Sequence, residues 1–486
     1  MSFFSVGKEI IMKEVVIIGA GIVGSFLAYD LCHYKDVHVT LIDKHNDVAE
    51  ETSKANSAII HAGYDPKEGT LKARLNKRGA DLYYKLYKEL GFEYHRCGAF
   101  VVACNEEEEA VLDHLYQQGV KRHVEMKYLS GDEVRKQEPH CSDGIIKALS
   151  VPETAIVTPW QVCEYLVEEA IINGLDLRLN EEVKQIQHQH LYKVVTNKQS
   201  YKADLVINSA GLGSAHIMQM IEEKPLFTIT PKRGQYFVLS KQANHMVDHI
   251  IYPVPSSVGK GVLALPTIHG NILLGPTGEI MDDVDTGTTS AGLAQVKEKI
   301  TKTIKDIPYQ EVIHTYSGVR PIGNDGDFYI EESKAHPGFI HLGCIDSPGL
   351  ASAPAISEYV IEHFLCNHIS TEQKDVYHHR KQLVEMRLLT PEQKQAMIQK
   401  QPKYGHIVCF CEQISEQEVI DCIHHPCGAT SIQGVKKRVR PGMGKCQGGY
   451  CEVEIAKLLA RELQIPLHEV KYNETSYFMD AKEDVK

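Results

Sequence analysis

Residues 15–31 read VVIIGAGIVGSFLAYDL, an apolar run followed by a glycine-rich turn and a second apolar run. The first run has the length of a buried parallel strand, and the second has the length of a helix. The turn carries the pattern Gly19-x-Gly21-x-x-Gly24. The next strand-like run, VHVTLIDK, contains Asp43, 19 residues after the last glycine. Together these features predict a β-α-β unit with a dinucleotide site.

The residues of this pattern have separate physical roles. Gly19 allows the tight turn, Gly21 lets the backbone approach a pyrophosphate, and Gly24 lets helix and strand pack closely. The N-terminus of the helix offers unpaired N–H groups and the positive end of its dipole to the phosphates. Asp43 is expected to accept hydrogen bonds from a ribose 2′-hydroxyl and to disfavour a 2′-phosphate.

A second strand followed by glycines, LVINSAGLGS at residues 205–214, favours FAD over NAD as the dinucleotide. This segment would return to the sheet and bring Gly211 beside the cofactor, where any side chain would collide. The position of the first motif near the N-terminus points the same way. Because the Gly-x-Gly-x-x-Gly pattern occurs once, we expect a second protein to carry NAD if NAD is the final acceptor.

The composition narrows the class of protein. The chain has 486 residues, 43% of them hydrophobic and 24% charged, which indicates an ordinary globular protein. Its formal charge of −12 argues against nucleic-acid binding. No run of 18 or more apolar residues occurs, so we expect no transmembrane segment, whereas peripheral membrane contact stays open. Thirteen cysteines without an export signal indicate a reducing compartment, which we expect to be the cytoplasm.

The pattern of elements predicts an α/β fold in which a Rossmann-like FAD-binding domain is interleaved with an α+β substrate domain, followed by a small helical cysteine domain. The expected boundaries are a leader at 1–12 with Met12 as the natural start, the FAD unit at 13–365, a helical linker at 366–406, the cysteine domain at 407–472 and a frayed tail at 473–486. Within the FAD unit, the FAD-binding parts are expected at about 13–80, 150–215 and 320–365, and the substrate-domain parts at about 81–149 and 216–319.

Four cysteines form two closely spaced pairs. Cys409-x-Cys411 is followed after 34 residues by Cys446-x4-Cys451. Such pairs can converge on one metal centre, and each precedes a predicted helix whose N-terminal dipole favours thiolate. Four thiolates can hold either tetrahedral zinc or a [2Fe–2S] cluster, and free thiols are the third alternative.

Two further features lie between these pairs. Cys422 falls within a predicted helix, so we prefer the outer four cysteines as ligands over Cys422 and Cys427. A basic run precedes the second pair and comprises Lys436, Lys437, Arg438 and Arg440. It is expected to be a solvated face, a source of charge compensation for an anionic cluster, or a docking site for an acidic partner.

Several segments carry a resemblance to known families. The chain resembles the D-amino-acid-oxidase-like superfamily of flavoproteins, in which the Asn-x-Ala-Gly element within INSAGLGS is typical. Residues 52–86, TSKANSAIIHAGYDPKEGTLKARLNKRGADLYYKL, look like L-2-hydroxyglutarate dehydrogenases. RGQYFVLSK, LLGPTGEIMDD and IDSPGLASAPAISEYV look more like bacterial FAD-dependent glycerol-3-phosphate dehydrogenases with an extra cysteine domain. GMGKCQGGYC is similar to the bacterioferritin-associated-ferredoxin-like [2Fe–2S] domain, which implies iron–sulfur.

The resemblance also implies roles for individual residues. His61 is the expected base for a substrate hydroxyl, since its loop reaches the flavin in such proteins and imidazole titrates near neutral pH. Arg320 is expected over the substrate anion, because a guanidinium binds carboxylate or phosphate through forked hydrogen bonds. Arg233 is a weaker candidate for the same role, since the adjacent Lys232 indicates an ordinary basic turn. The further expected FAD contacts are Lys44, Ser53, Asn56 and Ser57, together with the helix N-terminus at Gly349 and Leu350.

These features predict a dehydrogenase that takes a hydride from a small anionic hydroxy compound to flavin N5 and passes electrons on through the cluster. By resemblance, glycerol 3-phosphate is the first choice of substrate and L-2-hydroxyglutarate the second, followed by an amine or amino acid. The expected partner is an electron-acceptor protein, for which an NAD-linked flavoprotein subunit is one candidate. An electron-transfer subunit whose partner binds the substrate and a zinc-stabilised scaffold are the alternatives from other classes.

Overall fold

The glycine-rich turn follows the carboxyl end of an interior strand of a six-stranded sheet in the computed structural model, which describes residues 12–255 and 261–479. Apart from Met12, the expected leader therefore lies outside the described residues. The strands of this sheet are parallel except for β20, which runs antiparallel to β21. In spatial order they are β20 (Tyr329–Glu332), β21 (Phe339–Gly343), β13 (Leu205–Asn208), β1 (Lys13–Ile18), β2 (Val37–Ile42) and β9 (Asp176–Arg178).

Successive residues of β1 face opposite sides of the sheet, as the pleat requires. Val15 and Ile17 pack against helices, whereas Val16 and Ile18 pack against a small antiparallel sheet. Both faces are covered, and this explains why β1 reads as an unbroken apolar run. The helices are α1 (Ile22–Leu31), α2 (Leu71–Leu90), α5 (Pro159–Ile172) and α8 (Gly349–His363), and the small sheet comprises β10 (Val183–His188), β11 (Tyr192–Thr196) and β12 (Ser200–Ala203).

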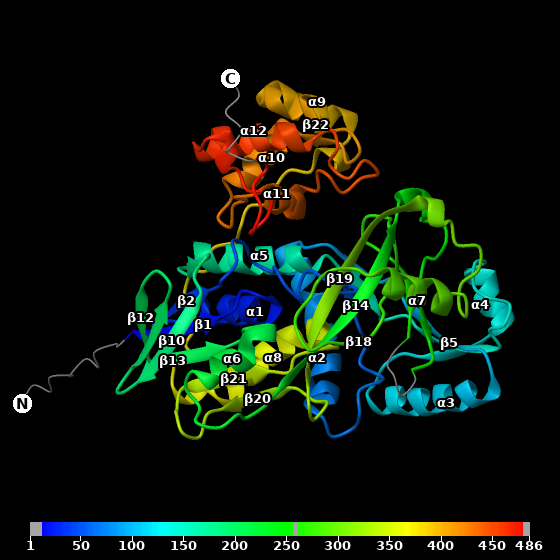
Figure 1. The fold of residues 1–486 in the computed structure, drawn as a ribbon, viewed down its shortest axis with the longest axis horizontal. Helices are drawn as coiled ribbons and strands as arrows, with labels where there is room; N and C mark the ends of the chain where they lie inside the picture. Colours follow the sequence, from blue (N-terminus) through cyan, green and yellow to red (C-terminus); the bar gives the residue numbers. More distant parts are fainter. Residues whose placement is uncertain (1–11, 256–260, 480–486) are drawn as a thin grey trace, which may run out of the picture.

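The second domain is a mixed sheet built on a long antiparallel ribbon. β14 (Ile229–Leu239) and β19 (Val312–Gly323) pair along their whole length and run from the first domain into the second (Figure 1). The other strands are β18 (Glu279–Ile280), β17 (Ile272–Gly275), β16 (Leu263–Pro266), β15 (Ile250–Pro253), β5 (Ala99–Ala103), β7 (Lys147–Val151) and β6 (Lys127–Ser130). Its helices are α3 (Glu106–Lys121), α4 (Gly131–Gln137) and α7 (Ser290–Ile300), and α6 (Ser214–Gln219) follows β13 in the first domain. A short sheet of β3 (Ile59–Ile60), β8 (Ala155–Val157) and β4 (Tyr94–His95) joins segments of both domains.

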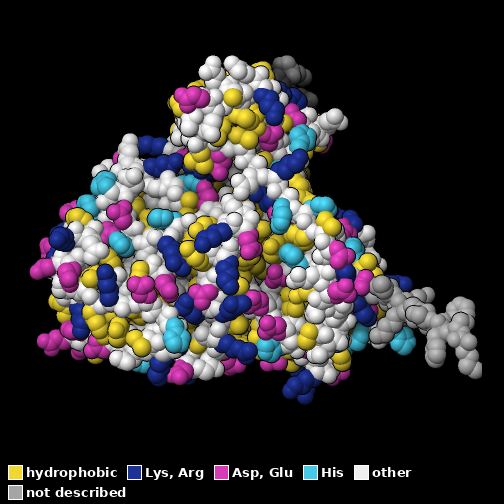
Figure 2. Space-filling view, turned by 180° about the vertical axis from the view of Figure 1, so that it is seen from behind, with side chains coloured by type: hydrophobic (Ala, Val, Ile, Leu, Met, Phe, Trp, Pro, Cys, Tyr) yellow, Lys and Arg dark blue, Asp and Glu magenta, His cyan; other side chains and the backbone are white. Residues whose placement is uncertain are grey.

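The C-terminal residues form a separate lobe above the larger body (Figures 1 and 2). Its apolar core lies between β22 (Ile407–Cys409), β23 (Ile414–Ser415), α10 (Glu416–Ile423), α11 (Ile432–Val439) and α12 (Glu452–Leu463). Of the expected helical linker, the structure forms α9 (Pro391–Lys400) and short 3₁₀ turns. The preceding residues run along α5, where Asn173 Nδ2 donates to the carbonyl of His378 at 2.8 Å.

The α/β architecture predicted from the sequence is confirmed, and individual elements agree closely. The helix expected from about Leu71 to Leu90 is α2, whose first turn is capped by the Thr70 hydroxyl and which ends at Gly91 in the left-handed region. The part of the expected frayed tail that is described folds back, and Tyr477 pairs with Lys471. No helix in the described ranges is long and apolar enough to cross a membrane.

Candidate active site and cysteine centre

The glycine turn between β1 and α1 has the geometry that the sequence pattern predicts. Gly19 has a φ of +106°, and a Cβ there would lie 2.5 Å from the carbonyl oxygen of Ser209, which directly follows the neighbouring strand β13. A Cβ on Gly24 would lie 1.9 Å from the Gly19 oxygen, so this glycine is needed for helix and strand to approach. Gly21 is the N-cap of α1, and it lines a large cavity together with Ile22 and Val23 of the first turn.

This cavity has a volume of about 1020 Å³ and lies between the two larger domains. It brings together residues that are distant in the sequence. All the residues predicted for the cofactor or the catalytic site line it except Gly24, which packs beneath the turn; they are Gly19, Gly21, Asp43, Lys44, Ser53, Asn56, Ser57, His61, Gly211, Arg320, Gly349 and Leu350.

The segment after β2 is hydrogen-bonded to the glycine turn. Asp43 accepts from the backbone N–H of Ala20 at 2.7 Å and from that of His45 at 2.9 Å. Burial raises the pKa of Asp43, and these hydrogen bonds favour its charged form. Each carboxylate oxygen can accept a second hydrogen bond, so Asp43 can still bind a ribose hydroxyl. The next residue, Lys44, pairs with Glu51 at 2.7 Å.

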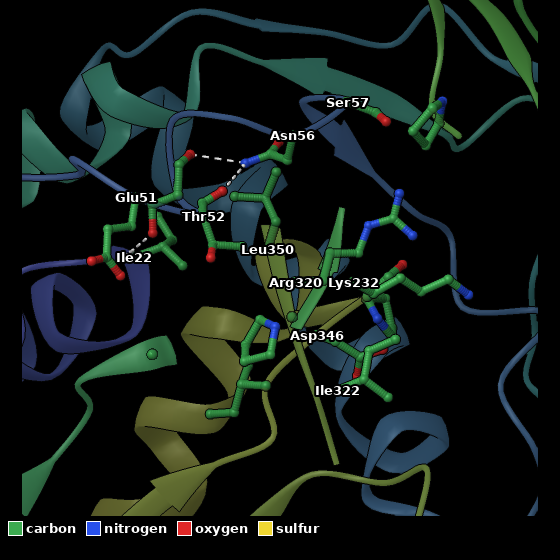
Figure 3. A pocket seen from close by; sticks show the side chains of 18 of the residues that line it. Ile22, Glu51, Thr52, Asn56, Ser57, Lys232, Arg320, Ile322, Asp346 and Leu350 are labelled. Atoms are coloured by element: carbon green, nitrogen blue, oxygen red, sulfur yellow. Dashed lines mark hydrogen bonds between the residues drawn. The ribbon is translucent and has the colours of Figure 1, made fainter. Parts of the chain in front are cut away.

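The residues that follow form a second wall of the cavity (Figure 3). The Ser53 hydroxyl accepts from the N–H of Ile22 at 2.9 Å, and Asn56 Nδ2 donates back to the carbonyl oxygens of Thr52 and Ser53 at 2.9 Å. The Ser57 hydroxyl lies 2.9 Å from that of Tyr236 on β14. These contacts join the wall to the glycine turn and to the substrate domain.

The opposite end of the cavity is formed by α8 and the loop after β13. Gly349 and Leu350 are the first two residues of α8 and line the cavity, so the positive end of the helix dipole lies beside it. The N–H of Gly349 itself donates to the carbonyl of Asp346. Gly211 has a φ of +54°, and a Cβ there would meet no protein atom within 4 Å among the described residues. Gly211 therefore borders open cavity space, which is consistent with close approach to a bound cofactor.

His61 is buried at the wall of the cavity. Its Nδ1 accepts from the backbone N–H of Gly63 at 3.1 Å, which places the proton of the neutral ring on Nε2. Nε2 lies 3.5 Å from a carboxylate oxygen of Asp65, so an acidic group is placed to stabilise the imidazolium form. Asp65 was not identified from the sequence, although its spacing of four residues from His61 is short.

Arg320 on β19 is directly opposite Lys232 on β14, and both side chains line the cavity (Figure 3). Burial and the neighbouring guanidinium lower the pKa of Lys232. The acidic group that acts on both is Asp346, which is itself paired with Lys72 at 2.5 Å. Asp346 thus lies near three cations at the cavity wall, Lys72, Lys232 and Arg320.

Lys232 is a site residue that the sequence analysis missed, and the signal was present. Adjacent residues of a strand face opposite sides, so only one of Lys232 and Arg233 can point into the cavity. The weaker candidate Arg233 points away: it is 4% exposed and pairs with Glu279 at 2.8 Å and Asp285 at 2.7 Å. Its assignment to the substrate anion is wrong, because these two carboxylates already occupy the guanidinium.

The four cysteines predicted as ligands lie together in the C-terminal lobe as two pairs. Cys411 Sγ is 3.6 Å from Cys446 Sγ, and the thiols of Cys409 and Cys451 are close enough to influence each other. Cys411 is exposed, whereas Cys409 and Cys451 are buried. Within the described ranges no three potential ligands meet closely enough for a single metal ion. Four cysteine thiolates are the ligand set of a [2Fe–2S] cluster, so the two thiol pairs fit such a centre.

Glycines shape this centre. The neighbouring Cys451 thiol lowers the pKa of Cys409 to about 6. Backbone N–H groups, among them that of Gly442, lower this pKa further, whereas burial raises it. A Cβ on Gly444 would lie 2.3 Å from the Cβ of Cys411, so the two cysteine loops can meet only at a glycine. Cys422 and Cys427 contact other groups, the carbonyl of Val419 and the guanidinium of Arg438 respectively.

The basic run is not a solvated face, which corrects one expectation. The side chains of Lys437 and Arg438 are buried and paired with the FAD-binding domain, at Asp47 and Glu50. Arg440 is also buried and pairs with Glu412 at 3.3 Å. The acidic partners of the basic run, Asp47, Glu50 and Glu412, therefore belong to the same chain.

Comparison with known protein families supports both the dinucleotide site and the cysteine centre. Residues 14–363 match the FAD dependent oxidoreductase (DAO) family, and residues 407–461 match the BFD-like [2Fe-2S] binding domain. The chain belongs to the FAD dependent oxidoreductase family. It binds FAD in its larger unit and a [2Fe–2S] cluster in its C-terminal lobe, and it is an FAD-dependent oxidoreductase.

Individual relatives resemble the chain over most of its length. It is 40% identical to a glycerol 3-phosphate dehydrogenase of Caloramator mitchellensis, with 96% of this chain and 98% of the relative covered. It is 30% identical to a mitochondrial L-2-hydroxyglutarate dehydrogenase of Arabidopsis thaliana, covering 74% of this chain and 85% of that protein. The FAD-bound structure of L-alpha-glycerophosphate oxidase from Mycoplasma pneumoniae matches with a TM-score of 0.71 and 31% identity, covering 75% of this chain and 97% of that one.

Proposed function

We propose that the chain oxidises glycerol 3-phosphate to dihydroxyacetone phosphate. The observation that carries this proposal is the pair of cations Lys232 and Arg320, placed opposite each other at the cavity wall. A phosphate dianion matches two cations in charge, and a guanidinium can donate two parallel hydrogen bonds to it. The similarity to a glycerol 3-phosphate dehydrogenase over 96% of the chain supports the same substrate.

The residues of the cavity divide the work of binding and proton transfer. Lys232 and Arg320 hold the phosphate, which fixes the position of the carbon to be oxidised. His61 takes the proton of the substrate hydroxyl at Nδ1, the ring nitrogen with a lone pair, and the Gly63 N–H must then release it. Asp65 stabilises the resulting imidazolium through Nε2. When bound, FAD supplies hydride acceptance and the [2Fe–2S] cluster supplies one-electron transfer.

The proposed FAD contacts follow the same geometry. The N–H groups of the glycine turn and of the first turn of α1, other than that of Ile22, which Ser53 accepts, bind the pyrophosphate, and Asp43 binds the ribose. Lys44, Ser53, Asn56, Ser57 and Gly211 line the walls that enclose the cofactor. The N-terminus of α8, at Gly349 and Leu350, stabilises negative charge that develops on the reduced ring. Cys409, Cys411, Cys446 and Cys451 are the proposed ligands of the cluster.

L-2-Hydroxyglutarate is the second candidate substrate. Its two carboxylates could also bind the cations, and a dehydrogenase for it is 30% identical to this chain. An amine or amino acid fits the two cations less well, since an ammonium group would face like charges.

For the acceptor we propose a separate redox protein, with an NAD-linked flavoprotein subunit as a candidate. The exposed thiol of Cys411 supports this, because it brings one edge of the centre to the surface. We place the enzyme in the cytoplasm, with peripheral membrane contact left open. None of the thirteen cysteines, all of which lie in the described ranges, forms a disulfide, which supports a reducing compartment.

An anaerobic absorbance titration tests the substrate. Glycerol 3-phosphate is expected to bleach the flavin bands at once, and L-2-hydroxyglutarate is expected to leave them unchanged. Bleaching by the second compound alone would replace the first candidate by the second. A His61→Gln variant is expected to bind glycerol 3-phosphate with unchanged affinity but to bleach at least 100-fold more slowly. Bleaching at the wild-type rate would show that His61 is not the base.

A further inference from the structure

The C-terminal lobe holds one loop of the FAD-binding domain, the segment 44–53 after β2, which we call the junction loop. Lys437 on α11 makes the most direct contact. Its Nζ donates to the carbonyl oxygen of Val48 at 2.9 Å and pairs with Asp47 at 2.9 Å and with Glu50. The Lys437 side chain is 9% exposed, so these interactions are shielded from solvent. All three groups that it contacts belong to the junction loop.

Arg438 holds the same loop and also its own domain. Its two terminal nitrogens fork onto the carboxylate of Asp47 at 2.8 and 2.9 Å. The same guanidinium donates to the carbonyls of Cys427 at 2.8 Å and Gly434 at 3.1 Å, both within the C-terminal lobe. Removing Arg438 would therefore disturb the lobe itself, whereas the side chain of Lys437 contacts the junction loop. Lys437 is the cleaner probe of the contact.

The junction loop is in turn bonded to the phosphate-binding turn. The N–H of Ala49 donates to the carbonyl of Ala20 at 3.0 Å, and the N–H of Ala20 donates to Asp43 at 2.7 Å. Ala20 lies between Gly19 and Gly21. Its N–H is therefore oriented by Asp43, and its C=O is oriented by Ala49 of the junction loop. The position of this turn sets the direction of the N–H groups that face the cavity.

Ala49 has a backbone conformation that needs outside support. Its φ of +56° lies in the left-handed region, which costs a residue with a Cβ about 1–2 kcal/mol. Such conformations persist where the surrounding structure fixes them. The two neighbours of Ala49 are Val48 and Glu50, and both are held by Lys437. Lys437 of the C-terminal lobe thus holds the residues on both sides of Ala49, and Ala49 in turn orients Ala20.

We propose that Lys437 and Arg438 are positioning residues for the FAD site, supplied by the iron–sulfur domain. They act through the junction loop and keep the Ala20 peptide oriented for pyrophosphate binding. Docking of the C-terminal lobe and FAD binding are then coupled, and each strengthens the other by the same factor.

The experiment compares FAD binding by full-length protein stripped of FAD. In the Lys437→Met variant the dissociation constant for FAD is expected to rise at least tenfold, equivalent to about 1.4 kcal/mol. Iron content is expected to stay at the wild-type level, because the Lys437 side chain contacts the junction loop and not a cysteine. In the FAD-free protein, the amides of Ala20 and Ala49 are expected to exchange with solvent faster than in the wild type.

Arg461→Met is the matched control, since Arg461 pairs with Glu416 and Glu462 inside the C-terminal lobe. It is expected to leave both the dissociation constant and the exchange rates unchanged. Wild-type values for both quantities in Lys437→Met, with iron retained, would overturn the proposal. If that variant fails to fold, Asp47→Asn weakens the docking contact from the side of the junction loop, because it removes the charge that pairs with Lys437 and Arg438, and it leaves α11 intact. A wild-type dissociation constant for Asp47→Asn would then refute the coupling.

Discussion

Replacing Lys232 by methionine separates a substrate-binding role from a structural one. Lys232 faces Arg320 across the β14–β19 pair, and burial together with that guanidinium lowers its pKa. Two like charges about 4 Å apart repel by about 1 kcal/mol in water and by about 4 kcal/mol at an effective dielectric constant of ~20, and the repulsion falls as the separation grows. Methionine removes this repulsion while keeping most of the apolar stem. The substrate-free protein is therefore expected to melt at the same temperature or higher.

Substrate binding is expected to become weaker in the Lys232→Met variant, although the substrate-free protein is as stable or more stable. A hydrogen bond to a charged group contributes about 1.5–3 kcal/mol, which corresponds to a rise in KM of about 10- to 150-fold for glycerol 3-phosphate. Because the phosphate is bound before and during the reaction, kcat should change little. Dye-coupled steady-state kinetics and thermal melting of the FAD-loaded protein measure the two quantities. Lys224→Met, at an exposed lysine, is the control. A KM within twofold of wild type, together with a lower melting temperature, would refute the reasoning.

Three further predictions concern pH, stability and the cluster. The KM for glycerol 3-phosphate should rise at alkaline pH, because Lys232 has a lowered pKa and loses its proton at a lower pH than an ordinary lysine. In Lys232→Met this alkaline rise of KM should disappear. Arg233→Met should leave KM unchanged but lower the free energy of unfolding by roughly 1–2 kcal/mol in urea titrations, since Glu279 and Asp285 lose a buried partner. Cys446→Ser should abolish the iron–sulfur absorbance, while glycerol 3-phosphate still bleaches the flavin anaerobically.

Each of these has an outcome that contradicts it. A pH-independent KM in the wild type would show that Lys232 stays charged or does not contact the substrate. A raised KM in Arg233→Met would return that residue to the substrate site. Loss of flavin bleaching in Cys446→Ser would show that the cluster domain also holds the active site together.

Local sequence predicted the elements whose geometry is set by neighbouring residues. The glycine turn and α2 are of this kind, because a turn conformation or a capping hydroxyl such as that of Thr70 acts within a few positions. Lys232 escaped prediction because its role depends on pairing with Arg320, a strand partner 88 positions away. The same limit applies to Lys437 and Asp47, which are far apart in sequence and meet only through docking of two domains.

Lys437 and Arg438 are buried where the C-terminal lobe meets the larger body, and buried charges resist separation. If the lobe swung away in each turnover, these cations and Asp47 would have to be hydrated and then dehydrated again, at a cost of several kcal/mol per ion. A C-terminal lobe that stays docked avoids that cost and keeps the distance between the flavin and the cluster constant. Electron passage inside the enzyme is then not limited by diffusion of a tethered lobe, and solvent viscosity should leave its rate unchanged.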